Sequence, residues 1–135
     1  MTFSIVARIG DAYGVAVASK FIAVGSVVPA ARVGVGAVAT QAMAKVSYAA
    51  DALALLGAGA GAAEAVARLT SLDELREDRQ LGVVAATGQA TFTGRDCMDW
   101  AGGVHGGDKD SGYAIQGNIL AVSYTHLTLP TIYSV

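Results

Sequence analysis

Thr2 is the residue of this chain best suited to chemistry, because it directly follows the initiator Met1. Threonine is small enough that a methionine before it is normally removed, and removal leaves a hydroxyl and a free α-amine on one residue. Such a residue is a nucleophile that carries its own general base, since a free α-amine has an ordinary pKa of about 8. The alternative interpretation is that Met-Thr is only a common start of a cytoplasmic protein.

Two predicted strands position Thr2 at the edge of a sheet. Residues 3–9 alternate between two faces, as a β-strand does, and residues 15–18 form a short, wholly apolar strand. Gly10 and Gly14 bound the turn between these strands, so the pattern predicts a hairpin. The face of the first strand that we expect to pack on the core consists of Phe3, Ile5, Ala7 and Ile9.

The rest of the chain changes from strand to helix periodicity and back. Strands are predicted over residues 32–39, 80–86, 90–94 and 113–120, and helices over residues 47–57 and 62–70. Residues 73–79 are charged and are expected to form a solvated turn or a short helix, and residues 101–112 a Gly-rich loop. Strands followed by two helices and then by more strands are typical of an α+β layered domain.

The composition limits the classes of function. The chain has 135 residues, enough for one domain, and 53% of them are hydrophobic and 15% charged. A net charge of −2 without a basic face argues against nucleic-acid binding, and no apolar run approaches the roughly 20 residues that span a membrane. A single cysteine and no secretory signal pattern favour a cytoplasmic location. No cofactor is expected, and a homo-oligomer is possible.

Three other features resemble functional sites at first sight. Cys97 is expected to be a buried thiol rather than a nucleophile, because only Arg95 lies near it as a cation. Residues 57–61 are rich in glycine but follow a helix instead of a strand, so they do not form a phosphate loop. Five acidic or histidine residues could be read as metal ligands, but their spacing matches no metal motif, so a solvated loop is expected instead: Asp96, Asp99, His105, Asp108 and Asp110.

Several motifs resemble a known family. They are residues 2–7, 14–21, 35–42, 79–84, 92–94, 97, 100–102, 112–113 and 116–120. In order and spacing, from Thr2 to about Ala121, they resemble the bacterial and archaeal domain of unknown function 1028, whose members are described as candidate N-terminal-nucleophile (Ntn) hydrolases. The resemblance implies the αββα sandwich that proteasome subunits and penicillin acylases share. It implies no particular substrate.

The resemblance also implies roles for residues beside Thr2, which takes the place of the nucleophile. Proteasome subunits place an Asp and a Lys there, and by position the counterparts in this chain are Ser19 and Arg32, with Lys20 as a second candidate cation. Ser19 carries no charge and Arg32 cannot release a proton, so the arrangement departs from that of the proteasome. The alternative is that Ser19 only ends a strand and that both cations are solvated.

An oxyanion site is implied at the end of the Gly-rich strand. The backbone N–H groups around Thr40, Gln41 and Ala42 fall where Ntn enzymes place the oxyanion donor. Gln41, Gln116 and Asn118 are amides in otherwise apolar strands, where a buried polar group needs a partner. Each of these amides is therefore either structural or substrate-binding.

The leading expectation is an Ntn-type hydrolase of an amide or other C–N bond, acting on a small-molecule or peptide-like substrate. The alternatives are a non-catalytic binding or scaffold domain on the same fold, and an activity that depends on Cys97. Residues 1–121 are expected to be the N-terminal part of the domain. Residues 122–135 do not continue the family pattern and are interpreted as sequencing-adaptor read-through. The second helical layer would then be missing and this truncated chain inactive.

Overall fold

The computed structural model describes residues 1–121, which form two sheets and a helical layer. In chain order the elements are β1 (Thr2–Ile9), β2 (Ala12–Ser19), the 3-10 helix η1 (Val24–Ser26), β3 (Pro29–Arg32), β4 (Gly36–Ala42), α1 (Ser47–Gly57), α2 (Ala62–Ser71), the 3-10 helix η2 (Arg76–Asp78), β5 (Arg79–Ala85), β6 (Gly88–Thr93), β7 (Gly102–Gly107) and β8 (Ser111–Asn118). The interpretation of residues 122–135 as a non-native tail lies outside the described residues. No helix in the described part is both long and apolar enough to cross a membrane.

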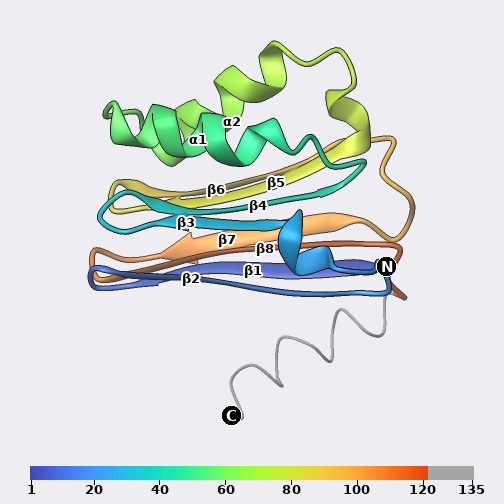
Figure 1. Cartoon of the computed structure of the whole chain (residues 1–135), viewed down its shortest axis with the longest axis horizontal. Helices are drawn as coiled ribbons and strands as arrows, with labels where there is room; N and C mark the ends of the chain where they lie inside the picture. Colours follow the sequence, from blue (N-terminus) through green and yellow to red (C-terminus); the bar gives the residue numbers. More distant parts are fainter. Residues whose placement is uncertain (122–135) are drawn as a thin grey trace.

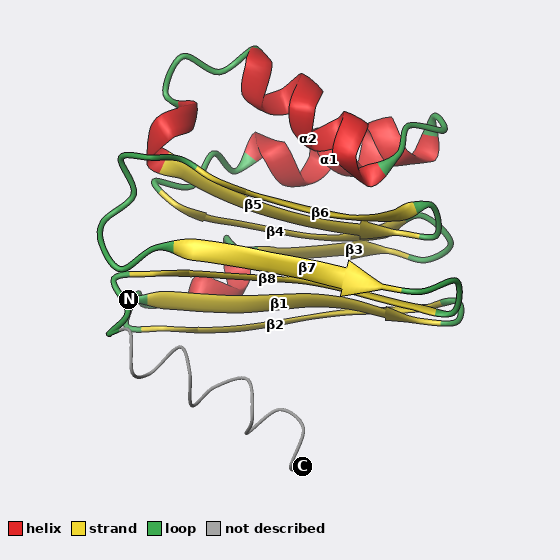
Figure 2. Ribbon diagram, turned by 180° about the vertical axis from the view of Figure 1, so that it is seen from behind, coloured by secondary structure: helices red, strands yellow, loops and turns green. Residues whose placement is uncertain are grey.

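The elements stack in layers. The first sheet has the strand order β2-β1-β8-β7 and the second sheet the order β3-β4-β5-β6, and all pairings are antiparallel. Both helices cover one face of the second sheet, and the first sheet lies against its other face (Figures 1 and 2). The predicted α+β class is therefore confirmed, with three layers in the described part of the chain.

β1 is central to the first sheet because it pairs on both sides. Its register with β2 runs from Thr2 opposite Ser19 to Ile9 opposite Ala12, which is the predicted hairpin. On its other side Thr2 lies opposite Asn118 of β8. Thr2 is therefore at the end of an interior strand and not on an edge strand.

The structure corrects the predicted orientation of β1. The side chains that face the second sheet are Ser4, Val6 and Arg8, which are 0%, 0% and 6% exposed. The outer face carries the set that was expected to pack on the core: Phe3, Ile5, Ala7 and Ile9. A polar residue is buried at low cost when it has hydrogen-bond partners, and Ser4 has two, Gln41 and Gln116.

Two strand predictions also need correction. The single strand predicted over residues 32–39 is divided between β3 and β4, which are joined by a turn in which Gly34 has a φ of +72°. β7 lies inside the predicted Gly-rich loop. A glycine is required in β7 at Gly102, because a Cβ atom there would come within 2.6 Å of the Trp100 ring. Both helices begin where the sequence places them.

Two apolar clusters fill the space between the layers. Tyr48 and Leu56 of α1 pack with Leu81 and Val83 of β5, between the helices and the second sheet. The cluster between the two sheets is made of short side chains: Val6, Val28, Ala37, Ala39, Val84 and Ala114.

A buried hydrogen-bond network joins the two sheets at the Thr2 end. Gln80 Oε1 accepts from Gln41 Nε2 and from Asn118 Nδ2, each at 2.9 Å, and Gln80 Nε2 donates to the Gly117 carbonyl at 2.8 Å. Ser4 Oγ donates to Gln41 Oε1 at 2.6 Å. The four polar side chains are 0–4% exposed, so the network fixes how the sheets lie against each other.

A buried carboxylate joins the helical layer to β5. Asp73 Oδ2 accepts from Tyr48 Oη at 2.5 Å and from Arg79 Nε at 2.9 Å. The hydrogen bond from Arg79, supported by those from Tyr48 and the Leu75 N–H, holds the pKa of Asp73 well below its usual range against the effect of burial. Burial and the bond to Asp73 raise the pKa of Tyr48, which keeps its hydroxyl a donor. The expectation that residues 73–79 are solvated is therefore wrong for Asp73.

Gly82→Ala in β5 is expected to lower the free energy of unfolding by about 1–3 kcal/mol. A Cβ atom at Gly82 would overlap the end of the Gln116 side chain, which is fully buried and bonded to Ser4 and Thr91. Gly14→Ala in β2 is the control, since a Cβ there meets nothing within 4 Å and should change stability by less than about 0.5 kcal/mol. Urea denaturation measures both, and equal effects would contradict the expectation.

Asp73→Asn is expected to destabilise the fold by about 3 kcal/mol at neutral pH, because it leaves the mostly buried guanidinium of Arg79 without its charge partner. Folding lowers the pKa of Asp73, so the unfolded chain binds the proton more tightly and the contribution is lost as the pH falls. The difference in unfolding free energy between the two proteins should be constant above about pH 5 and shrink below about pH 4. A difference that grows on acidification would refute this assignment.

Candidate functional site

Thr2 lies in a cleft of about 300 Å³ at one end of the molecule. The cleft is lined by Thr2, Phe21, Val24, Val27, Val28, Gln41, Ala42, Met43, Ala44 and Arg79. These residues come from the start of β1, the connection between β2 and β3, the end of β4 with the loop after it, and the start of β5. The cleft therefore forms where the chain crosses from the first sheet to the second, at the end where Figure 1 marks the N-terminus.

The structure brings Ser19 to Thr2. Their hydroxyl oxygens are 3.0 Å apart. Ser19 Oγ donates its one proton to the Met1 carbonyl at 2.8 Å and accepts from the Phe21 N–H at 3.1 Å. The Thr2 hydroxyl must therefore be the donor to Ser19 while Met1 is present. Removal of Met1 takes away this acceptor and frees the Ser19 proton.

Neither predicted cation has a side chain in the wall of the cleft. Lys20 is exposed, and its backbone N–H contacts the Met1 carbonyl at 3.4 Å. Arg32 is exposed at the end of β3, opposite Gly36, whereas β4 reaches the cleft at Ala42. Gly36 and Ala42 are about 20 Å apart along the strand. The structure does not bring Arg32 to Thr2, because β3 runs away from the cleft.

The end of β4 offers a backbone donor to the cleft. The Thr40 N–H donates to the Val28 carbonyl at 3.0 Å, so it is used within the fold. N–H groups two residues apart on a strand point the same way, so the Ala42 N–H points past Val28 toward the cleft that Ala42 lines. The positive φ of Ala42, 67°, turns the chain out of the sheet after this residue. Of Thr40, Gln41 and Ala42, the last is therefore best placed to bind an oxyanion.

The three amide side chains that were expected to be either structural or substrate-binding belong to the hydrogen-bond network between the sheets. Gln41 accepts from Ser4 and donates to Gln80, although it also lines the cleft. Gln116 Nε2 donates to Ser4 Oγ at 2.9 Å, and Asn118 Nδ2 donates to Gln80. Gln116 and Asn118 are 0% and 4% exposed and do not line the cleft. For these two residues the geometry supports the structural role.

Arg79 is a cleft residue that sequence reasoning missed. It is the one charged side chain among the described residues that line the cleft. Its Nε donates to Asp73 at 2.9 Å and its Nη1 donates to the Met43 carbonyl. The charge of residues 73–79 suggested a solvated turn and hid the fact that Arg79 begins a buried strand. The available signal was its position directly before Gln80 and the apolar residues of β5.

Cys97 is not placed to act as a nucleophile. It is 9% exposed, and its Sγ donates to the Arg79 carbonyl at 3.4 Å. Burial, with smaller effects from nearby carboxylates, raises the pKa of the thiol. The thiolate that a nucleophilic cysteine needs is therefore disfavoured.

The acidic residues near β7 do not gather at a common point. Within residues 1–121, no three side chains of His, Cys, Asp or Glu lie close enough together to hold a metal ion. Asp108 Oδ1 instead accepts from the N–H groups of Asp110 and Ser111, each at 2.8 Å. These bonds, led by that from Asp110, lower the pKa of Asp108 and organise the turn between β7 and β8.

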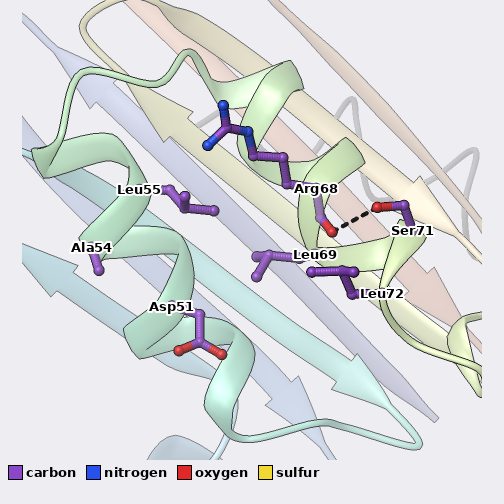
Figure 3. A pocket seen from close by; sticks show the side chains of 7 residues that line it. All are labelled: Asp51, Ala54, Leu55, Arg68, Leu69, Ser71 and Leu72. Atoms are coloured by element: carbon purple, nitrogen blue, oxygen red, sulfur yellow. Dashed lines mark hydrogen bonds between the residues drawn. The ribbon is translucent and has the colours of Figure 1, made fainter.

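A larger hollow lies on the helical layer. It has a volume of about 710 Å³, and Figure 3 shows its walls: Asp51, Ala54, Leu55, Arg68, Leu69, Ser71 and Leu72. Arg68 pairs with Glu64 at 2.7 Å, and the Ser71 hydroxyl donates to the Arg68 carbonyl at 2.9 Å. These walls hold no nucleophile beside a base, so the Thr2 cleft remains the candidate site.

Comparisons with known proteins agree with the sequence resemblance. The crystal structure of protein SPO2555 from Silicibacter pomeroyi, assigned to DUF1028, matches this structure with a TM-score of 0.80 and 32% sequence identity. The match covers 89% of this chain and 53% of that chain, so this chain spans about half the length of the relative. A comparison with curated proteins returned no match. The family model described as "Family of unknown function (DUF1028)" matches residues 2–132, and the chain therefore belongs to this family.

Proposed function

We propose that the full-length protein is an N-terminal-nucleophile hydrolase of an amide or other C–N bond, with Thr2 as the nucleophile after removal of Met1. The observation that carries the proposal is the Thr2 hydroxyl at the end of β1, inside a cleft and hydrogen-bonded to Ser19. A first residue of this kind supplies both a nucleophile and a base. Because DUF1028 is a family of unknown function, the proposal rests on this geometry and not on membership.

The proposed reaction begins when the Thr2 hydroxyl oxygen attacks the carbonyl carbon of the substrate. The hydroxyl proton passes to the Thr2 α-amine, directly or through a water, and the Ala42 N–H binds the oxyanion. The C–N bond then breaks, the leaving nitrogen takes the proton from the α-ammonium group, and an acyl ester remains on Thr2. Water attacks this ester with the amine again as base, which releases the acid and restores Thr2.

The proposal includes an αββα architecture for the complete domain, and the outer face of the first sheet supports it. Among the described residues, no strand position on this face carries a charge: Phe3, Ile5, Ala7, Ile9, Ala12, Gly14, Ala16, Ala18, Gly102, Val104, Gly106, Ser111, Tyr113, Ile115 and Gly117. An apolar face of this extent calls for a covering layer. The relative has further chain beyond the 53% that matches, which is the natural source of such a layer.

The second candidate function is a non-catalytic binding or scaffold domain on the same fold. It is favoured by the lack of any carboxylate among the described residues that line the cleft, since proteasome subunits have an Asp beside their nucleophile. The chemical reactivity of Thr2 separates the two candidates.

Thr2 is expected to be the first residue of the mature full-length protein, as mass spectrometry of the native protein would record. An electrophilic hydroxyl probe is then expected to label Thr2 in the folded protein faster than in the denatured control, because the cleft activates the hydroxyl. Thr2→Ala should abolish this labelling and lower amide hydrolysis by about 1000-fold or more. Retained Met1 would block the amine and refute the proposal.

Ser26→Ala is the matched control for Thr2→Ala. Within residues 1–121 the Ser26 hydroxyl bonds to the Ala23 carbonyl alone, at 2.7 Å, and Ser26 does not line the cleft, so removal of the hydroxyl should leave labelling and turnover unchanged. Labelling of Thr2 at the rate of the denatured chain would favour the scaffold function. Unchanged turnover in Thr2→Ala would exclude Thr2 as the nucleophile.

Ile5→Lys tests the outer face of the first sheet, which no helix of residues 1–121 covers. In the 135-residue chain it is expected to reduce binding of a hydrophobic dye and to improve solubility, because Ile5 lies on the outer face opposite Ile115. In the full-length protein the same change is expected to destabilise the fold by about 2 kcal/mol or more, because the lysine would be buried under the second helical layer. A full-length protein as stable as the parent would contradict the proposed layer.

A further inference from the structure

We infer that the cleft binds a small amide that carries a free carboxylate and an apolar body, and that Arg79 is the residue that binds the carboxylate. The inference rests on the proposed function for the amide bond, and it adds the substrate class. Four features of the structure carry it: the position of Arg79, its free donors, the location of its charge partner and the character of the remaining walls.

Arg79 and Thr2 line the same cleft. Arg79 begins β5 opposite Ala42, and the next residue, Gln80, accepts the hydrogen bond from Asn118 on the first sheet. Asn118 is in turn the register partner of Thr2. Both Thr2 and Arg79 line the cleft, one from each sheet. A substrate whose carbonyl reaches Thr2 therefore has Arg79 within the same enclosure.

The Arg79 guanidinium keeps donors for a ligand. Of its five N–H donors, Nε is used by Asp73 and one on Nη1 by the Met43 carbonyl. The other three have no hydrogen-bond partner among the described residues, and the side chain is 13% exposed. Two parallel N–H groups of a guanidinium match the two oxygens of a carboxylate, a geometry that lysine does not offer.

The charge of Asp73 does not cancel Arg79 on the side of the cleft. Asp73 does not line the cleft, and its oxygens also accept from the Tyr48 hydroxyl at 2.5 Å and from the Leu75 N–H at 3.0 Å. Asp73 thus restrains the guanidinium through Nε from outside the cleft. The cleft is left with a positively charged group at one end of an otherwise uncharged wall.

The remaining walls favour an apolar body next to that carboxylate. The large apolar residues of the lining are Phe21, Val24, Val27, Val28 and Met43, and of these Phe21 and Met43 are 64% and 68% exposed. A cleft of about 300 Å³ is at the small end of ligand sites. The geometry therefore suits an N-acylated apolar amino acid or a compound of similar size, rather than a folded protein or a long peptide.

The test uses the full-length protein and two probes that differ only in charge, N-acetylleucine and N-acetylleucinamide. Calorimetric titration of the Thr2→Ala variant measures binding without turnover. N-acetylleucine is expected to bind about tenfold tighter or more, because a charge-assisted bond to Arg79 replaces a neutral one. Arg79→Gln should remove this preference and Arg79→Lys should retain part of it. Lys20→Gln, which removes an exposed charge outside the cleft, should leave the preference intact.

Equal affinity of the two probes with Arg79 present would overturn the inference, and so would a preference that survives Arg79→Gln. If Arg79→Gln does not fold, the double variant Arg79→Gln/Asp73→Asn removes both charges of the pair and gives the same comparison. Selective carboxylate binding without hydrolysis by the parent protein would support the inference and count against the hydrolase. Hydrolysis without carboxylate preference would support the hydrolase and overturn the inference.

Discussion

The hydrogen bonds around Gln80 decide how the two sheets of this protein lie against each other. Apolar side chains alone tolerate sliding, whereas a buried amide left without a partner costs about 1–3 kcal/mol. Gln80 satisfies Asn118 of the first sheet and Gln41 of the second. Asn118 lies opposite Thr2, and Gln41 comes directly before Ala42. The bonds that join the sheets therefore also set the Thr2 hydroxyl across from the end of β4.

The periodicity of the sequence predicts the elements well because periodicity is local. β1, β2, α1 and α2 follow from alternation and from the 3.6-residue stripe within each segment. The orientation of β1 does not follow, because Ser4 is buried by partners 37 and 112 residues away, Gln41 and Gln116. Two of the three inward-facing residues of β1, Ser4 and Arg8, are polar and its outer face is apolar, so hydrophobicity does not orient this strand.

The same difference between local patterns and long-range contacts explains which residues of the candidate site were predicted. The family resemblance implied Ser19 beside Thr2, and a single hairpin does place the two residues opposite each other. Arg32 was misplaced because the turn at Gly34 divides one apparent strand into two and sends β3 away from the cleft. Arg79 reaches the cleft only through the pairing of β4 with β5, across both intervening helices. The local sequence indicates that Arg79 begins a strand, but the partner of that strand is set by packing between distant segments.

Beside Thr2 this chain has the uncharged Ser19 where proteasome subunits have an Asp, and its cleft has Arg79 as a charged residue. In the proposed mechanism this arrangement suits an amine that acts as the base. A carboxylate beside a Thr2 amine would stabilise its protonated form, whereas the uncharged Ser19 hydroxyl is hydrogen-bonded to the Thr2 hydroxyl and adds no negative charge. Arg79, held in place by Asp73, puts a positive charge in the wall of the cleft. In the proposed mechanism this charge attracts the carboxylate of the substrate, so the residue that Asp73 holds in place also selects the substrate.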